Sequence, residues 1–238
     1  QERHEDRYET LTEVAMLKKV NIAVIGTGRI GSMHTRNLAH LIPEADLTAV
    51  CDIRLEVAQE VADELGIQRV VRDYHELLAD PEIEAVLIAT NTDTHARIVQ
   101  DCAVAGKQIF CEKPLALDLK DIDETIAVVK KAGVKLQIGF NRRYDKNFRR
   151  VKGIVDSGEI GHPCILQIVS RDPVPPSVEY ARTSGGMFLD MSIHDFDMAR
   201  FQVGEVEEVY AIGGVLVAPE LGEVDDIDTN LITLKFAS

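Results

Sequence analysis

The stretch VNIAVIGTGRIGSMH, residues 20–34, decides the fold of this chain. It opens with a short apolar run, which is typical of a strand buried in a parallel sheet. Gly26, Gly28 and Gly31 follow as G-x-G-x-x-G, and the next residues predict a helix. Such a loop can hold the pyrophosphate of a dinucleotide, because the free N–H groups of a helix N-terminus favour anions. The alternative is a plain glycine turn without a ligand.

Strand-like and helix-like segments alternate at short spacing from this loop to about residue 140. Apolar runs predict strands at 20–26, 46–52, 83–90, 108–114 and 134–140, with helical patterns between them. This alternation predicts an α/β fold, a Rossmann domain with a doubly wound parallel sheet. We place the domain at residues 16–140 and treat the charged residues 1–15 as an N-terminal extension without a role in the fold.

After about residue 145 the pattern changes to that of an α+β sheet domain, which we place at residues 141–238. We expect helices at 147–161 and 185–201, strands at 163–172, 206–217 and 229–238, and a Pro-rich loop at 173–186. The last strand-like run stops without a closing turn or helix. Because unfinished sheet edges are unusual, we expect this domain to be truncated at its C-terminus.

The composition excludes several classes of partner. The 238 residues carry 26 basic and 40 acidic side chains, a net charge of −14, which disfavours nucleic acid and anionic membranes. No apolar stretch approaches the length of a membrane span. The four cysteines form no C-x-x-C pair, so no zinc-ribbon motif is present, and a reducing, cytoplasmic location is favoured.

The second predicted strand ends at Asp52, where an acidic residue can bind the adenosine ribose hydroxyls of a dinucleotide. Its carboxylate repels the 2′-phosphate of NADP, so NAD is favoured over NADP. Arg54 is the alternative, since an arginine there could accept that phosphate, although a solvated residue at a helix start explains it more simply. The cofactor contacts expected in this part of the chain are Gly26, Gly28, Arg29, Ile30, Gly31, Asp52 and Ile53.

Polar residues also follow two later strands, at the sheet edge where open α/β folds bind ligands. Thr90, Asn91 and His95 are expected near the dinucleotide, and for His95 a surface position at a helix start fits equally well. Glu112 and Lys113 are likewise expected at the cofactor. A lysine there can bind a substrate hydroxyl or handle a proton, and the alternative is an exposed loop lysine.

The stretch GGMFLDMSIHDFDMARF, residues 185–201, is apolar on almost every side, yet it carries Asp190, His194 and Asp197. On a helix, spacings of four and three stack side chains on one face. Three interpretations are open: a buried Asp–His packing pair, a catalytic site, and a metal site that would need further ligands. Asp197, nearly two turns from Asp190, is expected to be structural.

Five motifs in this order resemble the glucose–fructose oxidoreductase/inositol dehydrogenase family, Gfo/Idh/MocA. They are the glycine loop, EKP at 112–114, GFNRRYD at 139–145, SRDP at 170–173 and the stretch 185–201. The resemblance covers residues 17–238. The last motif looks most like the inositol 2-dehydrogenase branch.

The resemblance implies catalytic roles for Lys113, Asp190 and His194. His194 would act as the base, Asp190 would orient its ring, and Lys113 would hydrogen-bond the reacting hydroxyl. The substrate contacts that the resemblance implies are Asn141, Arg142, Asp172 and His194.

The resemblance also implies NAD-dependent oxidation of a secondary hydroxyl in a cyclic polyol or sugar, with myo-inositol as the best substrate and hydride transfer to NAD. The alternatives are a dehydrogenase of an aldose or another sugar derivative, and a non-catalytic nucleotide-binding regulator. No metal is expected. A homo-oligomer is expected if the C-terminal sheet is complete.

Overall fold

A computed structural model describes residues 18–237. The expected extension, residues 1–15, lies outside the described residues. The chain divides into two compact units that meet between Val86 and Leu87. The expected domain boundary near residue 140 does not coincide with that junction and stays a prediction.

The first unit is built on three parallel strands, β1 (Val20–Ile25), β2 (Ala45–Cys51) and β3 (Arg69–Val71). Its helices are α1 (Arg29–Leu41), α2 (Leu55–Leu65) and α3 (His75–Leu78). The last three residues of β1 and of β2 are all buried. Such unbroken burial is expected where helices cover both faces of a parallel sheet. The three-residue β3 was too short for the apolar pattern to single out.

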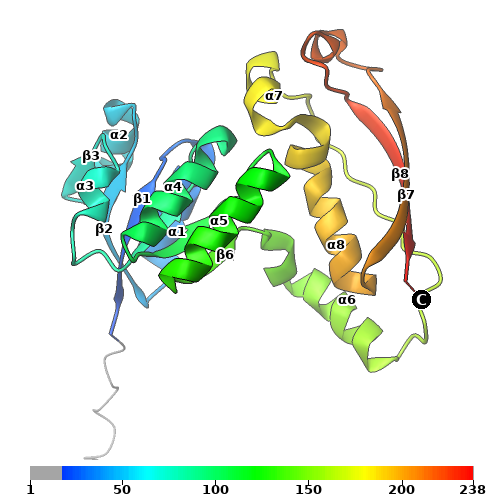
Figure 1. The fold of residues 1–238 in the computed structure, drawn as a ribbon, viewed down its shortest axis with the longest axis horizontal. Coiled ribbons are helices and arrows are strands. Elements are labelled where there is room, and N and C mark those ends of the chain that lie inside the picture. The colour runs from blue at the N-terminus through cyan, green and yellow to red at the C-terminus, as the bar shows by residue number, and fades with distance from the viewer. Residues whose placement is uncertain (1–17, 238) are drawn as a thin grey trace, which may run out of the picture. The chain divides into compact units, whose positions relative to one another are not determined.

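The sheet continues through the junction of the two units. β4 (Ala85–Ile88) spans it, and β5 (Gln108–Cys111), β6 (Leu136–Ile138), α4 (Thr92–Val104) and α5 (Leu119–Ala132) follow. The strand order is β3-β2-β1-β4-β5-β6. Figure 1 labels four strands of this sheet, β1, β2, β3 and β6. From β1 the chain adds β2 and β3 on one side of the sheet, and it then adds β4, β5 and β6 on the other side. This is the doubly wound Rossmann arrangement. The expected α/β fold is confirmed.

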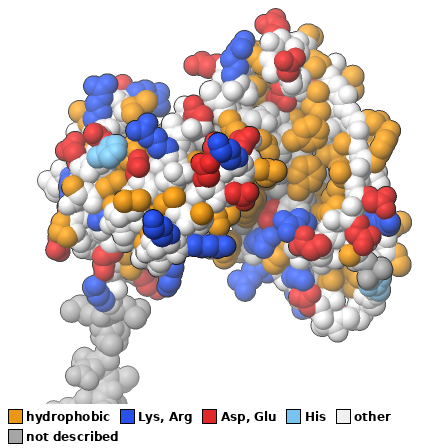
Figure 2. Space-filling view, in the orientation of Figure 1, with side chains coloured by type: hydrophobic (Ala, Val, Ile, Leu, Met, Phe, Trp, Pro, Cys, Tyr) orange, Lys and Arg blue, Asp and Glu red, His pale blue; other side chains and the backbone are white. Residues whose placement is uncertain are grey.

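The rest of the second unit combines helices with a small antiparallel sheet, as expected. Its elements are η1 (Asn141–Tyr144), α6 (Lys146–Ser157), α7 (Val178–Ser184), η2 (Met187–Ser192), α8 (Ile193–Val203), β7 (Val206–Gly214), η3 (Pro219–Val224) and β8 (Thr229–Phe236). β7 pairs with β8, with Tyr210 opposite Thr233 and Ile212 opposite Leu231. Several apolar side chains of this sheet are exposed, and Figure 2 shows apolar atoms at the surface of this part of the chain.

Three expectations for this part were wrong. Residues 163–172 form no strand, because no strand in residues 18–237 pairs with them, and an isolated strand gains no ladder hydrogen bonds. The Pro-rich loop contains helix α7, which Ser177 caps. The helix expected at 185–201 is divided into the π-helix η2 and the α-helix α8.

Among the described residues, no helix combines the length and the apolar character needed to cross a bilayer.

Candidate active site

Lys113 follows strand β5 and forms an ion pair with Asp190. Its Nζ donates to Asp190 Oδ1 and to the Asp190 carbonyl oxygen, both at 2.8 Å. The two side chains are 16% and 26% exposed, so the pair is largely shielded from water. The alternative of an exposed loop lysine is therefore wrong. An ammonium group has three donors, and the two contacts with Asp190 leave one for another acceptor.

Asp190 lies on the π-helix η2, and two glycines allow the chain to enter it. Gly185 has φ +89° and Gly186 has φ +67°, a conformation that other residues rarely adopt. Asp226 Oδ1 accepts a hydrogen bond from Met187 N at 2.9 Å. A Cβ on Gly186 would lie only 2.5 Å from the same oxygen. Gly186 thus lets the backbone pass close to Asp226, and the turn at the two glycines leads into the π-helix that presents Asp190 to Lys113.

Tyr180, on helix α7, also contacts Asp190, and the sequence analysis missed it. Its hydroxyl donates to Asp190 Oδ1 at 3.0 Å. The helix begins where Ser177 Oγ accepts a hydrogen bond from Tyr180 N at 3.2 Å. Ser177 was the available signal, since serine is a favoured N-cap.

His194 is the second residue of α8 and makes no hydrogen bond with Asp190 in the described part of the chain. The carboxylate is bonded to Lys113 and Tyr180 instead. A π-helix closes its hydrogen bonds over five residues rather than four, so the spacing of four does not stack these side chains as it would on an α-helix. The interpretation as a satisfied Asp–His packing pair is therefore wrong.

The surroundings of His194 lower the pKa of its imidazole below the ordinary value of 6.5. Burial is the largest cause, and the positive charges of Lys113 and Arg142 act in the same direction. Asp190 and Asp195 raise this pKa, but burial and the two cations outweigh them. The ring is accordingly neutral near pH 7 and able to accept a proton.

Arg142 is held beside this cluster by Asp195, the residue that follows His194. Arg142 Nη1 lies 2.5 Å from Asp195 Oδ1, and Ser170 Oγ donates to the same oxygen at 2.7 Å. The sequence analysis singled out Arg142 but not its partner Asp195. The ion pair links η1 to α8 and keeps the guanidinium charge near His194.

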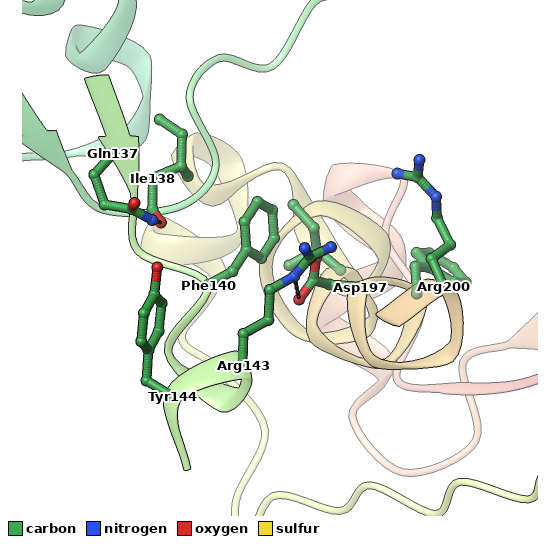
Figure 3. A pocket seen from close by; sticks show the side chains of 9 residues that line it. Gln137, Ile138, Phe140, Arg143, Tyr144, Asp197 and Arg200 are labelled. Carbon is green, nitrogen blue, oxygen red and sulfur yellow. Dashed lines mark hydrogen bonds and ion pairs between the residues drawn. The ribbon is translucent and has the colours of Figure 1, made fainter. Parts of the chain in front are cut away.

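A second arginine, Arg143, forms an ion pair with Asp197, which lies further along helix α8. Arg143 Nε lies 2.9 Å from both carboxylate oxygens of Asp197, which is 8% exposed. This ion pair suits the structural role expected for Asp197. Arg143 and Asp197 line an open cleft of about 500 Å³. Figure 3 shows the guanidinium directed at the carboxylate. Lys113, Asp190 and His194 do not line this cleft.

The other two expected substrate contacts lie at the surface. Asn141 is exposed at the start of η1, and Asp172 is exposed in the segment between α6 and α7. Neither side chain makes a hydrogen bond within the described residues, so their assignment stays a prediction.

In the first unit, Asp52 braces the glycine loop. Its Oδ2 accepts from Thr27 N at 2.8 Å and from Thr27 Oγ1 at 3.2 Å, and its Oδ1 accepts from Arg54 N at 2.9 Å. Asp52 is nearly buried, whereas Arg54 is 62% exposed and precedes α2. The exposed position of Arg54 agrees with its interpretation as a solvated residue at a helix start.

The glycine loop itself is suited to a pyrophosphate. Gly26 has φ +90° and makes the turn after β1, and Gly28 is the N-cap of α1. No side chain caps this helix, its first turn holds no acidic residue, and the space over Gly28 is open. Free N–H groups at an uncapped helix end favour an anion. Arg29 and Ile30 lie in that first turn, Gly31 is buried within it, and Ile53 is exposed after β2.

His95 does not lie where it was expected. Its ring is 1% exposed, with Nδ1 at 2.8 Å from the Pro114 carbonyl oxygen and Nε2 at 3.1 Å from the Thr90 carbonyl oxygen. Because both nitrogens face backbone oxygens, neither a surface position nor direct contact with a dinucleotide is correct. His95 instead joins the loop after β4 to the loop that carries Lys113.

The remaining expected cofactor residues lie at the ends of β4 and β5. Asn91 precedes helix α4, and Thr90 Oγ1 lies 2.7 Å from Thr94 Oγ1. Glu112 Oε2 accepts from Lys113 N at 3.2 Å. Within residues 18–237, no group of three or more His, Cys, Asp or Glu side chains could hold a metal ion.

Two stretches of the chain match known protein families. Residues 20–140 match a family described as an oxidoreductase family with an NAD-binding Rossmann fold, and residues 148–238 match the GFO/IDH/MocA C-terminal domain. The chain belongs to the Gfo/Idh/MocA oxidoreductase family. The resemblance inferred from the sequence is confirmed.

Two of the similar curated proteins are named as inositol 2-dehydrogenases. The myo-inositol 2-dehydrogenase of Thermotoga maritima is 50% identical over 92% of this chain and 66% of its own length. The inositol 2-dehydrogenase of Rhizobium meliloti is 41% identical over 92% of the chain and 66% of its own length. The chain thus spans just under two thirds of these relatives.

The fold of this chain is also similar to solved structures of inositol dehydrogenases. A putative myo-inositol dehydrogenase from Sinorhizobium meliloti has a TM-score of 0.88 at 41% identity, covering 92% of this chain and 66% of that one. The scyllo-inositol dehydrogenase of Lactobacillus casei, with bound NAD(H) and scyllo-inositol, has a TM-score of 0.79 at 32% identity, with the same coverage.

Proposed function

We propose that this member of the Gfo/Idh/MocA family takes part in the NAD-dependent oxidation of a secondary hydroxyl of a cyclic polyol, with myo-inositol as the best substrate. The observation that carries the proposal is the cluster formed by Lys113, Asp190 and His194. It combines a shielded ammonium that has a donor left with an imidazole whose pKa is lowered. The names of the similar proteins support the same substrate class.

Each residue of the cluster has a distinct role in this reaction. The third donor of Lys113 hydrogen-bonds the reacting hydroxyl and favours loss of its proton. The neutral ring of His194 accepts that proton, and the imidazolium that forms is stabilised by the charge of Asp190. NAD, when bound, supplies the hydride acceptor. The uncapped N-terminus of α1 and Asp52 are suited to hold its pyrophosphate and ribose.

The test is a panel of inositols, other polyols and aldoses, each with NAD and with NADP, followed by the absorbance of reduced cofactor. We expect turnover of myo-inositol or a related inositol with NAD. Turnover restricted to aldoses would favour the second candidate, a sugar-derivative dehydrogenase, which a TM-score of 0.78 to a levoglucosan dehydrogenase with NADH supports at 29% identity. NAD binding without turnover of any substrate would favour the regulator.

We further propose that the functional division of the chain lies near residue 140, which is supported by the two family matches on either side of it. The exposed apolar residues of β7 and β8 support a homo-oligomer formed through this sheet, and light scattering tests it. Four free cysteines, three of them buried, support a reducing, cytoplasmic location.

A further inference from the structure

Tyr180 places its hydroxyl on the same carboxylate oxygen that Lys113 uses. Tyr180 Oη lies 3.0 Å from Asp190 Oδ1, and Lys113 Nζ lies 2.8 Å from it. Two donors from different segments, α7 and the loop after β5, therefore converge on one oxygen. Within the described residues, Asp190 Oδ2 has no donor. A carboxylate held through one oxygen by two donors is restricted in its rotation about Cβ–Cγ.

Helix α7 is held by contacts other than the one between Tyr180 and Asp190. Ala181 is 6% exposed and packs with Ala218 and Leu221 in a small core cluster, whereas Tyr180 is 46% exposed. Ser177 caps the helix through the backbone N–H of Tyr180, not through its ring. The helix is thus anchored by other residues, and the Tyr180 hydroxyl is directed at Asp190.

We propose that Tyr180 is a positioning residue for proton transfer, which holds the Asp190 carboxylate in place between Lys113 and His194. This inference rests on the proposed function. Without the hydroxyl, Asp190 keeps only the donor from Lys113, its side chain gains rotational freedom, and its negative charge is shared with one partner instead of two. Lys113 then loses part of its alignment toward the reacting hydroxyl.

The electrostatic consequence is measurable at His194. The charged groups that face it are Lys113 from the end of β5, Arg142 from η1, Asp190 from η2 and Asp195 from its own helix. Among these, Asp190 raises the pKa of His194. A carboxylate that has lost a hydrogen-bond donor favours the imidazolium more strongly. Removing the Tyr180 hydroxyl should therefore raise the pKa of His194.

The experiment compares Tyr180→Phe with the parent protein and with Tyr210→Phe. Tyr210 is 67% exposed on β7 and is the matched control for loss of a hydroxyl. We expect Tyr180→Phe to lower kcat by roughly tenfold, in line with the loss of one hydrogen bond to a charged group. The dissociation constant of NAD and the melting temperature should be unchanged. The acid limb of the pH profile of kcat/KM, the range in which the rate rises as His194 loses its proton, should move to higher pH. Unchanged kcat and an unchanged limb would overturn the proposal.

A second readout does not depend on turnover. The His194 imidazole is titrated by NMR with ¹⁵N-labelled histidine, and its signal is assigned by its absence in His194→Ala. We expect the pKa of His194 to be higher in Tyr180→Phe than in the parent protein. When Tyr180→Phe is added to Asp190→Asn, we expect the pKa of His194 to stay as it is in Asp190→Asn alone. An equal pKa in the parent and in Tyr180→Phe, or a shift that persists in Asp190→Asn, would refute positioning through Asp190. If the parent protein oxidises no inositol, the proposed function fails, and this titration still decides the role of Tyr180.

Discussion

Lys113 and Asp190 are 77 residues apart in the sequence, yet Lys113 Nζ lies 2.8 Å from both Oδ1 and the carbonyl oxygen of Asp190. One contact is to the side chain and the other to the backbone of the π-helix. The lysine is therefore fixed relative to the helix itself and not only to one rotatable carboxylate. This arrangement leads to the following predictions for the proposed reaction.

Lys113→Ala should reduce turnover while leaving NAD binding largely intact, because the role assigned to Lys113 is on the reacting hydroxyl. Loss of one acid–base group costs ~10²–10⁴-fold in rate. Steady-state rates and NAD titration measure the two effects. The control is Lys120→Ala, whose side chain is 80% exposed on α5. Parent-like turnover in Lys113→Ala would contradict the assignment.

Asp190→Asn should move the acid limb of kcat/KM to lower pH and reduce turnover. A base works in its neutral form, so the rate rises with pH through the pKa of His194, which already lies below 6.5. Asp190 raises that pKa, and its removal lowers it further. The pH profile of kcat/KM is the measurement. A limb that moves to higher pH would show that the charge of Asp190 does not act on His194.

Arg142→Gln should shift the same limb in the opposite direction. The guanidinium lowers the pKa of His194, and its loss also leaves Asp195 without its cationic partner. Both changes favour the imidazolium, so the limb moves to higher pH. Arg143→Gln is the matched control, because Arg143 pairs with Asp197 and is not among the charges that act on His194. Equal shifts in the two variants would refute the specific role of Arg142.

Asp52→Ser should relax the preference for NAD by removing a charge that repels the 2′-phosphate of NADP. The substitution also removes acceptors for Thr27 and Arg54, so we expect a stability loss of ~1–3 kcal/mol. Asp52→Asn keeps one acceptor oxygen and should relax the preference at a smaller loss. Binding of both cofactors and thermal melting are measured together. Tighter binding of NADP than NAD by the parent would contradict this prediction and indicate Arg54 as a phosphate ligand.

Gly186→Ala should destabilise the turn into η2, because the residue has φ +67° and its Cβ would approach Asp226 to 2.5 Å. Strain of this kind costs ~1–3 kcal/mol. We expect a lower melting temperature and, since Asp190 follows on the same π-helix, lower turnover per folded molecule. Gly153→Ala is the control, because its Cβ would meet no atom within 4 Å in α6. Equal melting temperatures for the two variants would show that the turn tolerates a side chain.

The Rossmann part of the chain could be predicted from the sequence because its signals are local. Apolar runs of strand length, helical periodicity and the glycine loop at 26–31 each depend on residues only a few positions apart, and the observed strand order agrees with them. Lys113, Asp190 and His194 were also identified, through motifs whose order along the chain carries the information.

Only the tertiary structure decided how these residues meet. The turn into the π-helix depends on Gly186 passing close to Asp226, about 40 residues further along the chain, and on Gly185 passing close to Leu117. The contact of Tyr180 with Asp190, the ion pair of Arg142 with Asp195 and the burial of His95 likewise join separate segments. Residues 163–172 have the composition of a strand but no partner strand in the described part of the chain. Periodicity reports which side of an element is apolar, whereas hydrogen bonds, burial and pKa values depend on what packs against that element.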